Sequence, residues 1–133
     1  LAQITRIEEQ IAMKRRIFDW YYRSLKHFDY FDLNKEVKDA KSIYWMTSLF
    51  IKNKDIVDRN KLMMLLKKYN IDTRPVFSAI STYPIWLKKC LPQKNSLLIS
   101  QNSINLPSGI TLTKKDVDYI CNIIEGIFTK RIN

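Results

Sequence analysis

The chain has 133 residues, of which 46% are hydrophobic and 12% aromatic, so it is long and apolar enough to bury a core and is not a disordered segment. It carries 23 basic and 13 acidic residues, and the formal charge of +10 favours anionic partners such as nucleic acid, a membrane surface or a phosphorylated small molecule. With two glycines and one histidine, it lacks a glycine-rich phosphate loop and the residues for a histidine-rich metal site.

The cellular compartment is predicted from the absence of membrane-spanning and secretion signals in this sequence. No apolar run approaches the roughly 20 residues that span a bilayer, and residues 1–6 do not resemble a signal peptide. Cys90 and Cys121 have no paired spacing, which fits a reducing compartment. Because Leu1 is not an initiator methionine and a helix is expected almost from the first residue, we expect a piece of a longer cytoplasmic protein, without a membrane partner.

Residues 3–26 are predicted to form one long helix. Its apolar residues recur at spacings of three, four and seven: Ile4, Ile7, Ile11, Phe18, Tyr21, Tyr22 and Leu25. Such a helix is about 36 Å long, which exceeds the needs of a small domain. We therefore expect it to pair with a partner or to connect two domains.

The middle of the chain predicts two strands and a helix. Residues 28–33 suggest a short strand, and residues 42–52 a stronger one that is apolar on both faces and so central in its sheet. Asp58 is placed to cap a helix that ends at Tyr69. Asn70 then stands where a left-handed residue closes a helix.

The last part of the chain alternates short extended segments with helices. Pro75 suits the edge strand expected at residues 71–77, since proline lacks the N–H that an inner strand donates. Thr113 and Asp116 predict a capping box for the last helix, which carries a clear apolar stripe. The remaining expectations are a turn at 78–82, a short helix from 83 to 87, a helical turn or two at 95–102, an extended segment at 104–107 and the last helix at 113–129.

Together these elements predict an α/β (α+β) fold: a small mixed β-sheet packed with helices in two layers, the first and last helices side by side. We expect residues 1–133 to form one domain, with 1–26 as a connecting helix and 27–133 as the α/β body.

Arg74 is the residue that best suits ligand binding. It stands between a strand and a turn, on the stiff base that Pro75 provides, where a guanidinium can make a paired contact with a phosphate or carboxylate. The alternative, an ion pair with Asp72 at the surface, is the more common outcome for such a residue. The residues by themselves identify no catalytic, cofactor-binding or metal-binding group.

Several stretches, in order along nearly the whole chain, resemble pyridoxal-phosphate-dependent nucleotide-sugar aminotransferases of fold-type I, above all the GDP-perosamine synthase type. Residues 70–77 are similar to the family segment G-I-D-T-R-P-F-F, and residues 105–109 with 112–113 to its closing N-L-P-S-G-x-T-L-T segment. The other matching stretches are residues 1–4, 44–46 and 83–86.

The resemblance implies the small C-terminal domain of such an enzyme. The whole protein would transfer an amino group from glutamate to a nucleotide-linked 4-keto-6-deoxysugar, for a cell-surface polysaccharide such as lipopolysaccharide O-antigen. A large N-terminal domain would bind pyridoxal phosphate through its lysine, and homodimers would place the active sites at the subunit interface. On this basis Arg74, Phe77, Ser78 and Ser81 are candidate substrate-binding residues.

One departure from the family and two alternatives accompany this interpretation. Ser81 stands where relatives commonly carry a histidine, and Ser78-Ala79 replaces a typical Tyr-Pro, which leaves the sugar specificity open. Some relatives lack the cofactor lysine and dehydrate the sugar instead. The other alternative is a basic nucleic-acid-binding α/β domain that uses its aromatic residues for stacking, although no nucleic acid is expected if the resemblance holds.

Overall fold

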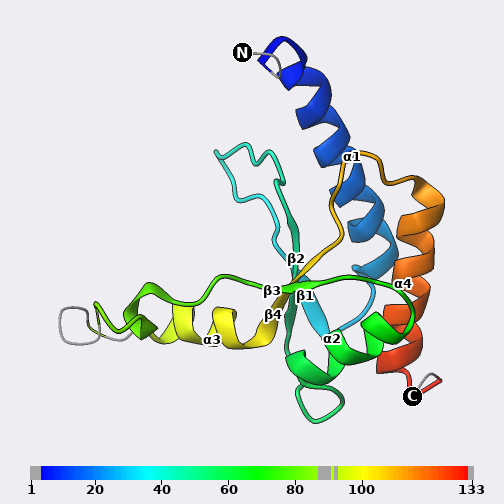
Figure 1. Cartoon of the computed structure of the whole chain (residues 1–133). Helices are drawn as coiled ribbons and strands as arrows, with labels where there is room; N and C mark the ends of the chain where they lie inside the picture. The colour runs from blue at the N-terminus through cyan, green and yellow to red at the C-terminus, as the bar shows by residue number, and fades with distance from the viewer. Residues whose placement is uncertain (1–3, 87–90, 92, 132–133) are drawn as a thin grey trace.

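The computed structural model describes residues 4–86, 91 and 93–131, which surround one small sheet (Figure 1). Within these residues the sheet has four strands in the order β1-β2-β4-β3, and every neighbouring pair is antiparallel. The strands are β1 (Phe31–Leu33), β2 (Thr47–Ile51), β3 (Arg74–Pro75) and β4 (Ser103–Leu106).

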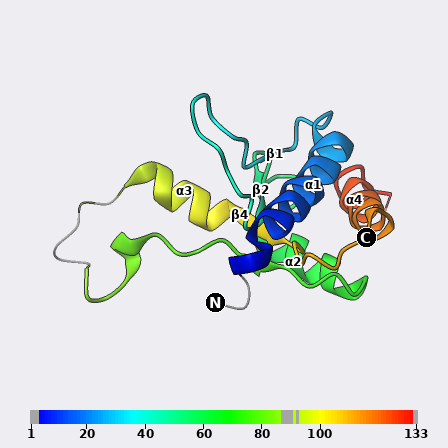
Figure 2. The ribbon, with the colours of Figure 1, turned by 90° about the horizontal axis from the view of Figure 1, so that it is seen from above.

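The helices divide between the two sides of the sheet. Helices α1 (Ile7–Leu25) and α4 (Lys114–Phe128) pack side by side on one side, and α2 (Arg59–Lys68) contacts α4 and β4. Helix α3 (Lys94–Asn102) leads away from the sheet on the opposite side in both views (Figures 1 and 2). The chain therefore has one covered sheet face and an arm, described at residues 76–86, 91 and 93–102, that projects from it.

The core lies between the sheet and helices α1 and α4. Strand β2 alternates, with Thr47, Leu49 and Ile51 buried and the residues between them half-buried. Leu49 pairs across the sheet with Leu33 on one side and Ile104 on the other, so a row of apolar side chains faces the helices. This pattern arises because successive side chains of a strand point to opposite faces.

The structure confirms the predicted fold class and several local features. The first and last helices lie side by side, and β2 is an inner strand. The Asp58 carboxylate accepts a hydrogen bond from the Lys61 N–H at the start of α2, and Asn70 after it has a φ of 59°. Thr113 caps α4 through a complete capping box.

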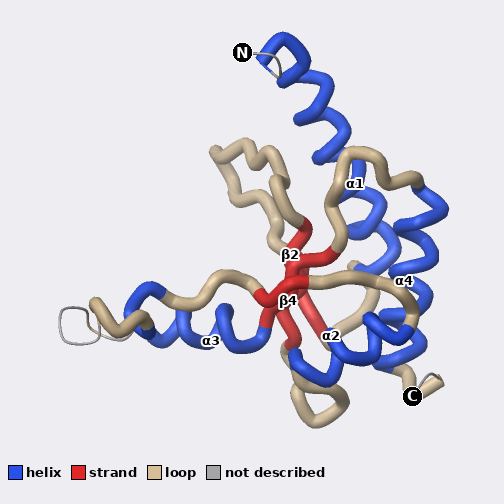
Figure 3. Tube along the Cα trace, viewed as in Figure 1, coloured by secondary structure: helices blue, strands red, loops and turns tan. Residues whose placement is uncertain are grey.

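Other expectations need correction. The sheet is antiparallel in the described residues, not mixed, because each strand returns beside its neighbour in the opposite direction. The strand expected at 42–52 is shorter, since residues 34–46 form a long loop that stands out from the sheet (Figure 3). The edge strand is reduced to Arg74–Pro75, extended by one hydrogen bond from the Val76 N–H to the Ser103 carbonyl.

The ends of the predicted helices and strands also shift. The first helix begins as a 3₁₀ turn, Ile4–Arg6, and the first strand covers only Phe31–Leu33. In place of the helix expected at 83–87, the Trp86 N–H closes a single turn onto the Tyr83 carbonyl. Residues 1–3 and 87, included in those expectations, and Cys90 lie outside the described residues. Each helix within 4–86, 91 and 93–131 is too short or too polar to cross a membrane.

The two halves of α1 have opposite environments. The C-terminal half is buried against the sheet and α4 through Ile17, Phe18, Tyr21 and Leu25. The first turns project beyond the body (Figure 1), and Ile7 is 45% exposed. The predicted apolar stripe is therefore real, but this chain covers only part of it.

Candidate functional site

The structure separates the four predicted substrate-binding residues into two neighbouring depressions. Arg74, on the edge strand β3, lines a small depression of about 230 Å³, here called the β3 depression. Phe77, Ser78 and Ser81 line a larger one of about 720 Å³ between the segment after β3 and helix α3, here called the arm depression. Three of the four residues are thus brought together, and Arg74 belongs to the adjacent site.

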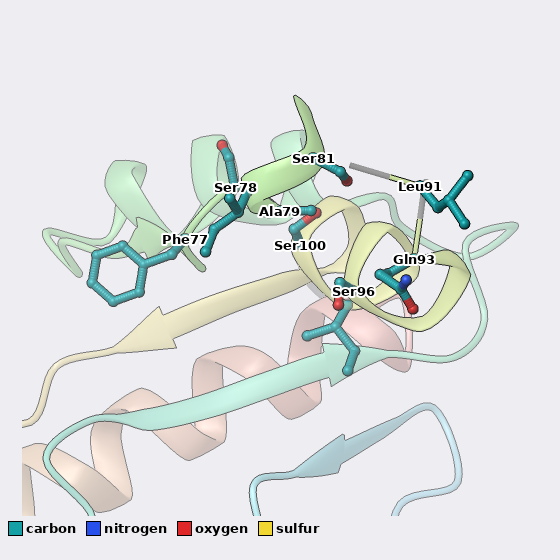
Figure 4. Close-up of a pocket in the computed structure, with 10 residues that line it drawn as sticks. Phe77, Ser78, Ala79, Ser81, Leu91, Gln93, Ser96 and Ser100 are labelled. Carbon is teal, nitrogen blue, oxygen red and sulfur yellow. The ribbon is translucent and has the colours of Figure 1, made fainter. Parts of the chain in front are cut away.

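The arm depression is lined by hydroxyl groups and apolar side chains. Figure 4 shows Ser78 and Ser81 on one segment and Ser96 and Ser100 on helix α3 opposite. The Ser100 hydroxyl donates to the Leu97 carbonyl at 3.0 Å and so serves its own helix. None of the described lining residues carries a charge, so this depression suits a neutral, hydroxyl-rich ligand more than a phosphate.

An aromatic pair joins the two depressions. Trp45 lines the β3 depression and Phe77 lines the arm depression. Their rings are nearly parallel, with an interplanar angle of 12° and centroids 6.1 Å apart. Because Trp45 is 56% and Phe77 66% exposed, both aromatic side chains remain accessible to a ligand.

Arg74 forms the ion pair that the sequence offered as the alternative to ligand binding. Its Nη2 lies 2.9 Å from Oδ2 of Asp72, and both side chains are more than 70% exposed. Ion pairs this exposed contribute little to stability, because water solvates both partners well when they separate. The guanidinium is therefore accessible and can exchange Asp72 for another acceptor.

Lys14 is a residue of this site that the sequence reading missed. Its Nζ donates to the Trp45 carbonyl at 3.0 Å and to the Ser108 carbonyl at 2.6 Å. Burial lowers the pKa of this ammonium. In the sequence Lys14 belongs to a run of three basic residues typical of a solvated helix face, and no local pattern distinguishes it from its neighbours.

Residues 105–109, part of the motif that carried the family resemblance, prove to be structural. The buried Tyr21 hydroxyl donates to the Pro107 carbonyl at 2.9 Å. The Thr47 N–H donates to the Ser108 hydroxyl at 2.9 Å, and that hydroxyl donates on to the Leu106 carbonyl. These bonds join α1, β2 and the end of β4, and they determine where the β3 depression lies.

Tyr44 adopts a backbone conformation that is unusual for a large side chain. Its φ is 47°, in the left-handed region. The ring stacks on Phe18 with centroids 3.6 Å apart, its hydroxyl accepts a hydrogen bond from the Glu36 N–H, and the Arg15 guanidinium lies 5.4 Å from the ring centroid. These contacts keep Tyr44 buried while Trp45, the next residue, faces solvent.

The described lining residues of the two depressions do not suit the covalent attachment of an aldehyde cofactor. Lys14 is the one lysine among the described lining residues of the two depressions, and both of its hydrogen bonds go to backbone carbonyls. Burial raises the pKa of the Cys121 thiol to about 12, so it is not a nucleophile at neutral pH. In the same residues no cluster of three or more His, Cys, Asp or Glu side chains is suited to a metal ion.

The chain matches known proteins over almost its whole length. Residues 1–125 match the model of the DegT/DnrJ/EryC1/StrS aminotransferase family. The chain is 30% identical over 131 residues to the GDP-perosamine synthase of Escherichia coli O157:H7, covering 98% of this chain and 35% of that protein.

Two solved structures share the fold. One is PseC of Helicobacter pylori, an aminotransferase of pseudoaminic acid biosynthesis, with a TM-score of 0.86, 19% identity and coverage of 98% of this chain and 36% of the other. The second is the GDP-4-keto-6-deoxy-D-mannose-3-dehydratase of Escherichia coli with bound hydrated pyridoxal phosphate, with a TM-score of 0.79, 20% identity and coverage of 92% and 32%. The chain thus spans about a third of the length of these relatives, and it belongs to the DegT/DnrJ/EryC1/StrS aminotransferase family.

Proposed function

We propose that this chain is the C-terminal domain of a pyridoxal-phosphate-dependent aminotransferase that acts on a nucleotide-linked 4-keto-6-deoxysugar, with glutamate as amino donor. The observation that carries the proposal is the match of residues 1–125 to an aminotransferase family, together with a GDP-perosamine synthase of which this chain covers 35%. Since the chain belongs to this family, a free-standing nucleic-acid-binding domain is no longer needed to explain its basic charge.

The distribution of exposed apolar side chains supports a larger assembly. Soluble monomers rarely leave many large apolar residues on projecting segments, because such surfaces favour association. Here they gather on the start of α1 and on the arm: Ile4, Ile7, Phe77, Ile80, Ile85, Leu91, Leu98 and Ile99. We place the large domain, and the second subunit of the proposed homodimer, against these segments.

The two depressions suit the two parts of a nucleotide-linked sugar. Ser78 and Ser81 can exchange hydrogen bonds with sugar hydroxyls in the uncharged arm depression. Arg74 supplies positive charge in the adjacent β3 depression, where the nucleotide would lie. Since Ser81 has no imidazole, it can donate and accept a hydrogen bond but cannot carry a proton in the reaction.

Pyridoxal phosphate would supply the electron sink that makes amino transfer possible. Lys14 is engaged with the Trp45 and Ser108 carbonyls, so we assign the cofactor lysine to the large domain. This chain would cover the substrate and exclude water. A cytoplasmic location and a role in O-antigen synthesis stay predictions that follow from the proposed substrate.

The test uses the complete gene product that carries this chain. We expect it to show the visible absorbance of bound pyridoxal phosphate and, with glutamate and GDP-4-keto-6-deoxymannose, to form an amino sugar and 2-oxoglutarate. Release of ammonia together with a 3-deoxy-4-keto sugar, in place of an amino sugar, would instead support the dehydratase alternative, which the fold shared with a sugar dehydratase motivates. Absence of both the cofactor band and turnover with any 4-keto sugar nucleotide would refute the proposal.

A matched pair of variants tests the assignment of the arm depression. Ser81→Ala is expected to raise KM for the sugar nucleotide severalfold, because one hydrogen-bonding group is lost, while the unfolding transition stays unchanged. Gln101→Ala, an exposed change on α3 outside the described lining residues, is the control and should leave KM unchanged. Equal kinetics for Ser81→Ala and wild type would remove Ser81 from the site.

A further inference from the structure

We propose that Trp45, Asp72 and Arg74 form a guanine-binding subsite in the β3 depression. The proposal rests on the proposed function, since it names the nucleotide half of the substrate. The base would stack on the Trp45 ring, with its polar edge against the Asp72 carboxylate and the Arg74 guanidinium. All three residues line the same depression.

Trp45 is held in place although its ring is exposed. Its carbonyl accepts a hydrogen bond from the partly buried Lys14 ammonium at 3.0 Å. The preceding residue, Tyr44, has a φ of 47°, a strained conformation for a tyrosine that the Phe18 stack and the Glu36 N–H stabilise. Strain of this kind persists where the surroundings over-determine it, and it is concentrated at functional sites. These contacts fix the backbone that carries the exposed Trp45 ring.

The indole of Trp45 is itself a fused two-ring system of about the size of a purine. Phe77 stacks against it, with 12° between the rings and 6.1 Å between their centroids, and Trp45 remains 56% exposed. Stacking on such a surface contributes to the binding of every base, and a two-ring purine covers more of it than a single-ring pyrimidine. The exposed indole of Trp45 therefore favours a purine.

The polar groups beside the ring distinguish guanine from adenine. Guanine has two adjacent N–H donors, at N1 and the 2-amino group, which match the two oxygens of a carboxylate, and its O6 and N7 acceptors match a guanidinium. Adenine lacks the paired donors. Asp72 and Arg74 lie 2.9 Å apart and are 72% and 74% exposed, so the base can contact both after a small rearrangement of the pair.

The experiment measures binding of free nucleoside diphosphates to the complete gene product by calorimetry. We expect GDP to bind most tightly, IDP, which lacks the 2-amino group, about fivefold more weakly, and ADP and UDP at least about tenfold more weakly. Trp45→Leu should weaken GDP binding about tenfold through lost stacking, and Trp45→Phe should weaken it less.

Two further variants separate the edge contacts from the stacking. Asp72→Ala should bring the affinities for GDP and IDP together, because the partner of the 2-amino group is gone. Trp86→Leu is the matched control: this tryptophan is 41% exposed and lies outside the described lining residues of both depressions. It should leave GDP binding unchanged. Thermal unfolding of each variant shows that the fold is retained.

The outcomes separate this inference from the proposed function. Equal GDP binding by wild type and Trp45→Leu, or binding of UDP or ADP as tight as that of GDP, would overturn the guanine subsite. Absence of GDP binding would overturn it as well. Cofactor absorbance and amino transfer, measured on the same samples, decide the proposed function independently, because a uridine-linked sugar could still serve as substrate.

Discussion

The two halves of helix α1 show how one continuous sequence pattern can serve two different surfaces. Ile17, in the second half, is 1% exposed, whereas Ile7, ten residues earlier on the same helix, is 45% exposed. Ile7 and Phe18, the neighbour of Ile17 with 6% exposure, were both expected in an apolar face that packs against something. The comparison teaches that the period of a helix predicts that a face will be buried, but not by which chain.

Helix α3 in the arm and helix α4 show the same contrast between an exposed and a buried element. Helix α4 buries eight residues, among them Ile124 at 0% exposure, because it lies along α1 and the sheet. Helix α3 buries only Ser100 and Asn102, at the end that joins β4. The covered side of the sheet therefore stabilises this domain, and the arm is free to make a binding surface.

The sharpest test of the comparison is the same substitution in both halves of α1. Ile17→Ala should lower the free energy of unfolding by about 2–4 kcal/mol, because it removes a fully buried side chain and leaves a cavity. Ile7→Ala should change it by less than about 0.5 kcal/mol. Urea unfolding of the two variants measures the difference, and equal losses would show that the start of α1 is covered within this domain.

A second test concerns the turn that leads from α2 toward Arg74. Asn70→Ala should lower the free energy of unfolding by about 1 kcal/mol, because an ordinary side chain at a φ of 59° is strained. Asn70→Gly, which restores the residue of the family segment, should cause no loss. A loss with glycine as large as that with alanine would show that the asparagine side chain, not the backbone conformation, matters.

A third test concerns the sheet face turned toward the arm. Within the described residues the Ser103 hydroxyl is buried and has no hydrogen-bond partner. Ser103→Ala should raise the free energy of unfolding by up to about 1 kcal/mol, since the penalty for an unsatisfied polar group is removed. Chemical denaturation tests this, with Ser100→Ala as control, because the Ser100 hydroxyl donates to Leu97 and its loss should not stabilise.

The pH dependence of stability offers a smaller effect. Hydrogen bonds from the Thr113 hydroxyl and the Thr113 N–H lower the pKa of Asp116 in the folded state. A lowered pKa means that this contribution is complete above the unfolded pKa of Asp and is lost as the pH falls through the folded value. Asp116→Asn should flatten the decline of melting temperature below about pH 4. An unchanged decline would show that Asp116 contributes nothing to it.

The smallest effect is expected at Gly109, within the motif that carried the family resemblance. Its φ is not positive, and a Cβ there would meet Thr111 Oγ1 at 3.8 Å, an ordinary contact. Gly109→Ala should therefore change the melting temperature by no more than about 1–2 °C. A larger loss would show that this loop is constrained by a contact outside the described residues, such as one with the proposed large domain.

The sequence by itself determined the local features of this protein. The long first helix, the Asp58 and Thr113 caps, the left-handed Asn70 and the edge position of Pro75 follow from spacing and backbone preferences of neighbouring residues. The resemblance of ordered motifs also predicted the family correctly. The sequence also predicted one shared site for Phe77, Ser78 and Ser81, and they do line one depression because they are neighbours in the chain.

Only the tertiary structure decided where the remaining site residues lie. Lys14 reaches Ser108, 94 positions away, and Trp45 meets Phe77 across two loops, contacts that no local period encodes. Local sequence patterns likewise did not predict how short and antiparallel the strands are, or that the first half of α1 is exposed. Side-chain spacing is determined within a few residues, whereas pairing across the chain depends on how all elements compete for the same buried surface.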